Sequence, residues 1–367
     1  MTDLRTTPLH GRHAALGASF TDFGGWSMPV RYTSDLAEHH AVRASAGIFD
    51  ISHMAEFLVE GADAAGFLDY ALAGRLSVMA TGKAKYSLIL TEHGGIVDDI
   101  IVYRLAEERF LIIANAGNRA PAFAALAERA EGRDVAVTDI SDDYAFLAVQ
   151  GPAAETILAS TPGIDEVDIP WSEQKYYAWA SARFAGEPLL LARTGYTGED
   201  GFELLVKAAD AEALWDAILA AGAPHGLVPA GLAARDTLRL EAGMPLYGHE
   251  LSLETLPVQA GLGRVVASDK EDFVGKGAAP ASGAPVLVGL VAEGRRAGRA
   301  GYAVVDDGGS AIGEITSGVL SPTLGHPIAM AYIDPSYAEV GTSVFLDVRG
   351  TAVPATVTAL PFYRRKK

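Results

Sequence analysis

The sequence predicts an α+β protein of layered helices and antiparallel strands, followed by a small antiparallel β-barrel. Two observations support this fold class. Up to residue 221, pairs of strands alternate with helices, which favours α+β layers over a parallel βαβ sheet. After a Gly/Ala/Pro-rich stretch at 275–285, the pattern changes to short strands separated by glycine turns. The length of 367 residues is enough for two or three domains.

The expected elements of the first part begin with a helix and continue as strands joined by short turns. Thr91-Glu-His-Gly-Gly joins two of these strands, and its glycines suit the positive φ of a hairpin turn. A segment at 47–54 leads into the first strand. The expected elements are helix 36–42, strand 55–59, helix 61–73, strands 85–90, 96–105 and 110–114, and helix 118–130.

The same kinds of element then recur, and no short-period repeat is present. They are strand 143–149, helix 153–159, strands 176–180, 188–192 and 202–206, and helix 211–221. The stretch 275–285 is interpreted as a linker, because it is small, flexible and weakly charged. Six short strands are expected after it, at 286–291, 302–305, 311–315, 328–333, 344–348 and 355–359.

Composition excludes several function classes. The chain has 29 Lys+Arg against 46 Asp+Glu, a net charge of −17, which argues against nucleic acid or an anionic membrane as a partner. Cysteine is absent, so thiol nucleophiles, thiolate zinc sites and cysteine-bound iron–sulfur clusters are excluded. The nine histidines show no ligand spacing, so no metal site is expected. The start of the chain has no apolar signal core, which favours a cytoplasmic location.

The first candidate functional feature is Asp98-Asp99 within Ile96-Val-Asp-Asp-Ile-Ile-Val. Because side chains alternate along a strand, Asp99 shares a face with Tyr103, while Asp98 lies on the opposite face. An ionised carboxylate among apolar neighbours is costly unless it is paired or hydrogen-bonded. On spacing alone, aspartates that cap the Gly94-Gly95 turn are the commoner explanation. The alternative is a carboxylate with a tuned pKa that faces a cationic or N–H-bearing ligand.

Two further features have the same ambiguity. Glycines at 195, 198 and 201 imply a tight loop with a close backbone approach, and Glu203 follows on the next strand. Arg235 and Arg239 lie four residues apart on one helix face, which Gly243 is expected to end. The ordinary explanation of the glycines is a turn, and their functional explanation is a ligand-binding loop. The ordinary explanation of the two arginines is a salt-bridged surface helix, and their functional explanation is a fork that binds a carboxylate.

Scattered tyrosines beside polar groups suit a flat heteroaromatic ligand, although tyrosines alone are usually core residues. They are Tyr86, Tyr103, Tyr176, Tyr177 and Tyr196. Taken together, the carboxylates, arginines and tyrosines suggest a pocket for a flat, N–H-rich molecule with a carboxylate tail. A reduced folate has this character.

The whole chain resembles the aminomethyltransferases, the T-proteins of the glycine cleavage system. The matching stretches occur in family order: Thr7–His10, Phe23–Pro29, Gly47–Met54, Gly94–Asp99, Arg193–Glu203, Gly231–Gly243, Ile315–Gly318 and Pro361–Arg364. The resemblance implies a three-domain cloverleaf with folate in a central channel. It further implies two interleaved α+β domains in 1–275, roughly 1–53 with 140–170 and 225–275, and 54–139 with 171–224, before a barrel at 285–367.

The resemblance also implies the activity and its site. Such proteins take the aminomethyl group from the lipoyl arm of H-protein and pass its carbon to tetrahydrofolate, giving 5,10-methylenetetrahydrofolate, ammonia and the dihydrolipoyl arm. The P- and L-proteins belong to the same system. Asp99 matches the catalytic aspartate, Glu203 the residue that holds the pterin, and Arg235 a folate-site arginine. Further matches to pocket positions are Met54, Tyr86, Tyr103, Asn115, Tyr177, Tyr196 and Arg364.

Two alternatives remain open from the sequence. Relatives with the same scaffold demethylate other small donors with tetrahydrofolate. A second alternative is a folate-binding protein without catalysis. Relatives of that kind carry a Lys-Gly-Cys motif, which a chain without cysteine does not have.

Overall fold

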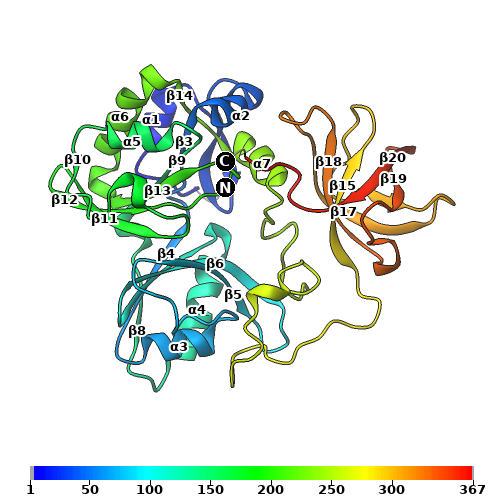
Figure 1. Cartoon of the computed structure of the whole chain (residues 1–367), viewed down its shortest axis with the longest axis horizontal. Coiled ribbons are helices and arrows are strands. Elements are labelled where there is room, and N and C mark those ends of the chain that lie inside the picture. The colour runs from blue at the N-terminus through cyan, green and yellow to red at the C-terminus, as the bar shows by residue number, and fades with distance from the viewer. Residues whose placement is uncertain (1–3, 366–367) are drawn as a thin grey trace.

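The computed structural model describes residues 4–365. Its strands form a seven-stranded sheet, a five-stranded sheet, a closed barrel of six strands and a separate two-stranded hairpin. In Figure 1 the two sheets lie one above the other, and the barrel lies to their right. The α+β class with a C-terminal antiparallel barrel is confirmed.

The seven-stranded sheet is antiparallel except between its last two strands. Its order is β10 (Ile164–Asp165), β11 (Trp179–Phe184), β12 (Glu187–Ala192), β13 (Gly201–Lys207), β9 (Tyr144–Gln150), β3 (Ala46–Asp50) and β14 (Leu227–Pro229). Helices α5 (Ala154–Ala159) and α6 (Ala211–Gly222) pack on its outer face. Phe202 and Leu204 of β13 meet Trp215 of α6 in that core. Since faces alternate along a strand, Glu203 points the other way.

The five-stranded sheet is wholly antiparallel. Its order is β5 (Ala84–Leu90), β6 (Ile96–Ala106), β7 (Arg109–Ala114), β4 (Ala55–Glu60) and β8 (Ala136–Asp139). Helices α3 (Ala64–Ala71) and α4 (Arg119–Ala130) cover its outer face. Ile100 and Val102 of β6 pack under these helices. The predicted alternation holds, because Ile101 and Tyr103 instead join the core between the two sheets.

The inner faces of the two sheets and helix α7 (Leu232–Glu241) enclose a third core. It contains Phe49 and Phe146 from the larger sheet, Tyr103 and Ile113 from the smaller one, and Leu238 from α7. Both strands that carry a candidate carboxylate, β6 and β13, therefore turn one face toward this shared interior.

Strand pairing differs from the predicted grouping of segments. We expected 171–224 to join 54–139, but β11, β12 and β13 pair in sequence and continue through β9 to β3. The grouping came from the family resemblance, and the sequence offered no check on it, because a hydrophobic pattern shows that a segment is a strand and does not show its partner. We therefore propose new domain limits, in which segments 140–170 and 171–224 both belong to the domain of the seven-stranded sheet.

The remaining elements near the N-terminus were partly unexpected. They are α1 (His10–Ala15), hairpin β1 (Ser19–Phe23) and β2 (Trp26–Arg31), and α2 (Asp35–Ala44). Only α2 has a predicted counterpart. Ser34 caps α2 by accepting a hydrogen bond from Ala37 N at 3.1 Å, a typical N-cap.

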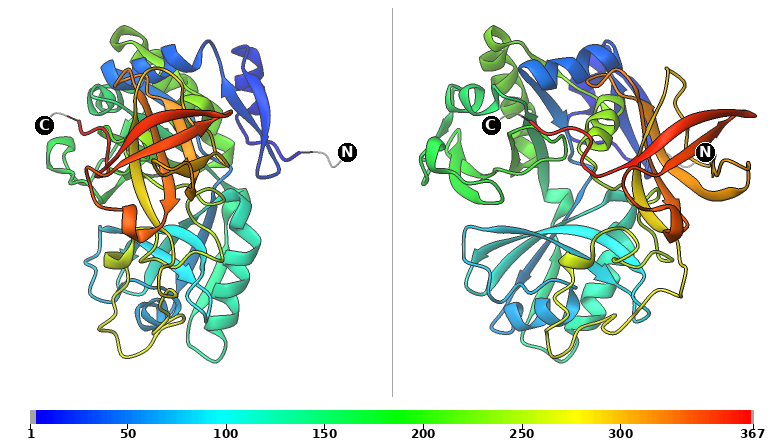
Figure 2. Two further views of the ribbon diagram at one scale, coloured as in Figure 1. Left: turned by 90° about the vertical axis from the view of Figure 1, so that its right-hand side faces the viewer. Right: turned by 45° about the vertical axis from the view of Figure 1, so that its right-hand side comes forward.

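The barrel closes in the order β15 (Val286–Ala292), β18 (Pro327–Ile333), β17 (Ala311–Leu320), β16 (Ala303–Val305), β19 (Ser343–Val348) and β20 (Thr351–Thr358). All six predicted strands are found, with β17 extending five residues further than the predicted end at 315. The irregular segment 244–285 passes along the five-stranded sheet before it enters the barrel (Figure 2). Residues 4–365 contain no helix long and apolar enough to cross a membrane.

Candidate active site

A cavity of about 280 Å³ lies between the two sheets and α7. Its wall is formed by β6, β7 and β13, the turn at 51–54, the loop around 195–196, and residues 243–246 after α7. Nine predicted site residues line it: Met54, Tyr86, Asp99, Tyr103, Asn115, Tyr177, Tyr196, Glu203 and Arg235. Residues from four separate parts of the sequence thus meet at one place.

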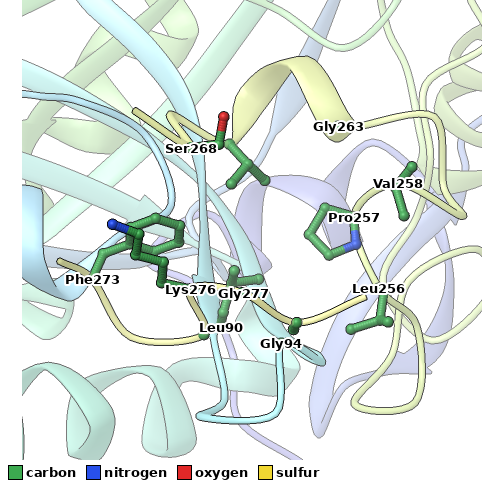
Figure 3. A pocket seen from close by; sticks show the side chains of 13 residues that line it. Leu90, Gly94, Leu256, Pro257, Val258, Gly263, Ser268, Phe273, Lys276 and Gly277 are labelled. Carbon is green, nitrogen blue, oxygen red and sulfur yellow. The ribbon is translucent and has the colours of Figure 1, made fainter. Parts of the chain in front are cut away.

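A second cavity, of about 420 Å³, lies between the β5–β6 hairpin and the segment 256–278 (Figure 3). Its lining is mostly apolar or glycine. The one titratable side chain in its wall is Lys276, whose Nζ donates to the carbonyl oxygens of Lys270 and Glu271 at 2.6 and 2.5 Å. Among residues 4–365 no other acid or base lines this cavity, so the candidate site is the cavity between the sheets.

The two adjacent aspartates have separate partners because they lie on opposite faces of β6. Asp98 is fully buried and accepts hydrogen bonds from Asn115 N, Asn115 Nδ2 and Asn118 Nδ2 at 2.9, 2.8 and 2.6 Å. Asp99 faces the cavity. It accepts from the Tyr86 hydroxyl at 3.0 Å and from Asn115 Nδ2 at 2.8 Å. The Asn115 amide therefore bridges both carboxylates.

Both carboxyl groups have raised pKa values. Burial raises the pKa of Asp98, and the neighbouring Asp99 charge raises it further. Burial also raises the pKa of Asp99, while the hydrogen bonds from Tyr86 and Asn115 partly oppose this. A carboxyl group whose pKa moves toward neutrality can both take up and release a proton under ordinary conditions. Asp99 has this property and faces the cavity.

Glu203 presents one carboxylate oxygen to the cavity and keeps the other bound to protein. Its Oε2 accepts from Thr194 Oγ1 at 2.5 Å, and the Tyr103 hydroxyl lies 3.0 Å from the same Thr194 oxygen. Within residues 4–365, Oε1 has no hydrogen-bond partner. Burial raises the pKa of Glu203, against the effect of the Thr194 hydrogen bond and the Arg235 charge. The free oxygen can accept an N–H donor from a ligand.

Arg235 and Arg239 have different environments despite their shared helix face. Arg239 is fully buried and satisfied: it bonds Glu250 Oε2 at 3.0 Å and Ser317 Oγ of the barrel at 2.7 Å. The Arg235 side chain forms no hydrogen bond or ion pair within the described residues, and its Nη1 is buried without a partner. Its guanidinium carbon lies 4.7 Å from the centre of the Tyr196 ring. The two arginines therefore do not form a fork for a ligand, because Arg239 is already bonded to protein. The Arg235 side chain is free to bind an acceptor group.

The backbone of the glycine loop at 195–201 comes close to other parts of the protein, and these close contacts are not with the cavity. A Cβ at Gly195 would lie 2.0 Å from Gln150 Oε1, and one at Gly198 would lie 2.9 Å from the Ala242 Cβ. Gly198 also has φ +78, which side-chain-bearing residues rarely adopt. The loop is therefore pressed against β9 and the end of α7. This packing sets Tyr196 and Glu203 on the cavity wall.

Comparisons with known proteins show the family to which the chain belongs. The family described as the GCVT N-terminal domain matches residues 9–270, and the family described as the glycine cleavage T-protein C-terminal barrel domain matches 286–364. The chain belongs to the aminomethyltransferase (glycine cleavage T-protein) family. The gap between the two matches falls on the predicted linker.

Full-length relatives support the family assignment. Aminomethyltransferases of Saccharopolyspora erythraea and Cutibacterium acnes are each 56% identical to the chain, and the match covers 100% of both proteins in each pair. The crystal structure of glycine cleavage system aminomethyltransferase T from Bartonella henselae has a TM-score of 0.90 at 38% identity. It covers 99% of this chain and 100% of that one.

One site residue expected from the resemblance to aminomethyltransferases lies apart from the others. Arg364 is exposed and does not line the cavity. Its neighbours anchor the tail: Tyr363 stacks on Arg43 at 4.0 Å, and Arg365 Nη1 lies 3.1 Å from Asp200 Oδ1. A folate contact for Arg364 stays a prediction.

Several cavity residues were missed from the sequence. They are Phe23, His53 and the stretch Met244–Leu246, which follows α7. Phe23 and His53 both lay in stretches that carried the family resemblance, but neither has a spacing that signals a ligand. The stretch after α7 has no polar pattern, so only the fold shows that it faces the cavity.

Proposed function

We propose that this chain transfers the methylene carbon of the aminomethyl group on lipoylated H-protein to tetrahydrofolate. The products are 5,10-methylenetetrahydrofolate, ammonia and dihydrolipoyl H-protein. The partners are H-protein directly, and the P- and L-proteins through the same system. A cytoplasmic location, expected from the sequence, stays a prediction.

One observation carries the proposal: a single aromatic cavity presents a free acceptor at Glu203, an unpartnered cation at Arg235 and a carboxyl group of raised pKa at Asp99. A reduced pterin has an edge of N–H donors next to acceptor atoms. Glu203 Oε1 suits the donors, since a carboxylate accepts charge-assisted hydrogen bonds from them. Arg235 suits an acceptor oxygen. Tyr86, Tyr177 and Tyr196 supply flat apolar surface for the rings.

The transferred carbon forms bonds to two nitrogens of tetrahydrofolate, and each of these nitrogens loses a proton. The carbon leaves the amine and the lipoyl sulfur, and each of these two groups gains a proton, so the step balances. Asp99 can take up such a proton and return it to the leaving amine, because burial brings its pKa nearer to neutrality. Tyr86 and Asn115 hold the Asp99 carboxylate in place by hydrogen bonds. The cavity between the sheets positions the reactants and limits water, which would otherwise release formaldehyde.

The test is ammonia release from aminomethyl-loaded, lipoylated H-protein with and without tetrahydrofolate. Fast release that depends on tetrahydrofolate, with 5,10-methylenetetrahydrofolate as the product, is expected. Folate binding without folate-dependent release would reject the proposal and favour a different methyl donor or a role in binding alone.

A further inference from the structure

The turn at 51–54 joins the two sheets and carries His53 and Met54 to the cavity wall. Its backbone is held from both sides. Asp50 Oδ1 accepts from Ser52 N at 2.9 Å, and Asp50 Oδ2 accepts from Thr7 Oγ1 at 2.6 Å and lies 2.8 Å from His13 Nε2. Ser52 Oγ accepts from Phe146 N at 3.0 Å. The position of His53 is therefore fixed before any ligand binds.

The His53 imidazole is 2% exposed, yet neither ring nitrogen has a hydrogen-bond partner among residues 4–365, and Nδ1 is wholly buried. Within the described part of the chain, the one aromatic ring in contact with it is that of Phe23, which meets it edge-on with centroids 5.4 Å apart. Buried polar side chains almost always have a partner. Because His53 lines the cavity, a bound molecule is the partner that the fold leaves room for.

Burial and the nearby charges keep the His53 ring neutral. Burial and, to a lesser extent, the Arg235 charge lower the pKa of His53, the Asp50 charge opposes them, and the pKa that results is about 4. A neutral imidazole has one N–H donor and one acceptor nitrogen. It is too weak a base to accept a proton near neutral pH, so His53 does not duplicate the role given to Asp99.

We propose that His53 is a folate-binding residue that donates a neutral hydrogen bond from its ring N–H to an acceptor atom of the bound folate. Arg235 is a second unpartnered donor that lines the same cavity. Glu203 meets the N–H donors of the same molecule. This inference rests on the proposed function and adds a residue to its ligand contacts.

The experiment measures the Kd of tetrahydrofolate by equilibrium titration of the full chain. His53→Phe keeps the ring shape and the Phe23 contact but removes both nitrogens. Asn and Gln differ in length, so His53→Asn and His53→Gln each place an amide N–H near a different ring nitrogen. The matched control is His40→Phe, a histidine on the exposed side of α2. Melting temperatures of all variants are recorded alongside.

We expect His53→Phe to raise the Kd about tenfold, the usual scale of one neutral hydrogen bond. We expect one amide variant, and not the other, to restore the Kd to within about threefold of wild type, and His40→Phe to leave it unchanged. The ratio of variant to wild-type Kd should stay constant from pH 6 to pH 8, a range that begins about two pH units above the His53 pKa.

A folded His53→Phe protein with the wild-type Kd would overturn the proposal. If His53→Phe does not fold, equal Kd values for the Asn and Gln variants would overturn it as well. A Kd ratio that changes between pH 6 and pH 8 would show a titrating ring and reject the neutral donor. Failure of the wild-type chain to bind tetrahydrofolate would instead reject the proposed function itself.

Discussion

Replacing Glu241 with glutamine is expected to destabilise the protein by about 3 kcal/mol at neutral pH, because Glu241 joins α7, α2 and the barrel. The carboxylate is fully buried. Its Oε2 accepts from Arg43 Nη2 at 2.8 Å, and its Oε1 accepts from Ser321 Oγ and Thr323 N at 2.5 and 3.0 Å. Glutamine keeps the shape but removes the charge opposite the buried Arg43 guanidinium.

The magnitude follows from the pKa of Glu241. Burial alone would raise this pKa, but the hydrogen bonds and charges of His39, Ser321 and Arg43 outweigh burial and lower it from 4.5 to about 2. One unit of pKa is worth ~1.36 kcal/mol, so the difference of about 2.5 corresponds to about 3 kcal/mol. Because the folded-state pKa is the lower one, this stability is complete above pH 4.5 and is lost as the pH falls toward 2.

The assay is urea unfolding of the wild type and Glu241→Gln at pH 7 and at steps below pH 4.5. The control is Glu60→Gln, which removes an ion pair of 2.9 Å with Arg109 between half-exposed side chains. That change is expected to cost less than about 1 kcal/mol. A Glu241→Gln protein within 1 kcal/mol of wild type at pH 7, roughly the cost of an exposed pair, or a gap that does not narrow in acid, would refute the reasoning.

Three further predictions concern the cavity. Asp99→Asn is expected to lower kcat at least about 100-fold while the Kd of tetrahydrofolate changes little, and a near-normal kcat would reject the proton-transfer role. The acid limb of the kcat–pH profile is expected to lie above the ordinary aspartate pKa of 3.8, because burial raises the pKa of Asp99, and a limb at or below 3.8 would contradict this. Glu203→Gln is expected to raise the Kd at least about tenfold in the same titration, since an amide can turn a donor toward the ligand's N–H groups, and an unchanged Kd would exclude Glu203 from the binding site.

Local sequence patterns predicted much of the cavity. Alternation along β6 placed Asp99 and Tyr103 on one face, and that face is the one that meets the cavity. Helical spacing placed Arg235 and Arg239 on one face of α7. What the spacing could not give was their partners: Arg239 is satisfied by Glu250 and by Ser317, which lies far along the chain in the barrel.

The parts that failed depend on long-range contacts. The pairing of β13 with β9 joins strands separated by more than 50 residues, and nothing in either strand's hydrophobic pattern specifies the other. His53 is a single histidine in a turn, and only the fold shows that its ring is buried, unpartnered and beside the cavity. Arg364 is a different case: it matches a family motif, its exposed side chain lies outside the cavity lining, and its folate contact stays a prediction.

The most direct test of the central claim is a single-turnover reaction with carbon-labelled aminomethyl groups on H-protein. The wild-type chain with bound tetrahydrofolate is predicted to move the label into 5,10-methylenetetrahydrofolate with one ammonia released per label. Asp99→Asn, with folate still bound, is predicted to leave the label on H-protein. Equal transfer by the two proteins, or label that appears as formaldehyde with the wild type, would contradict the assignment of this cavity and of Asp99.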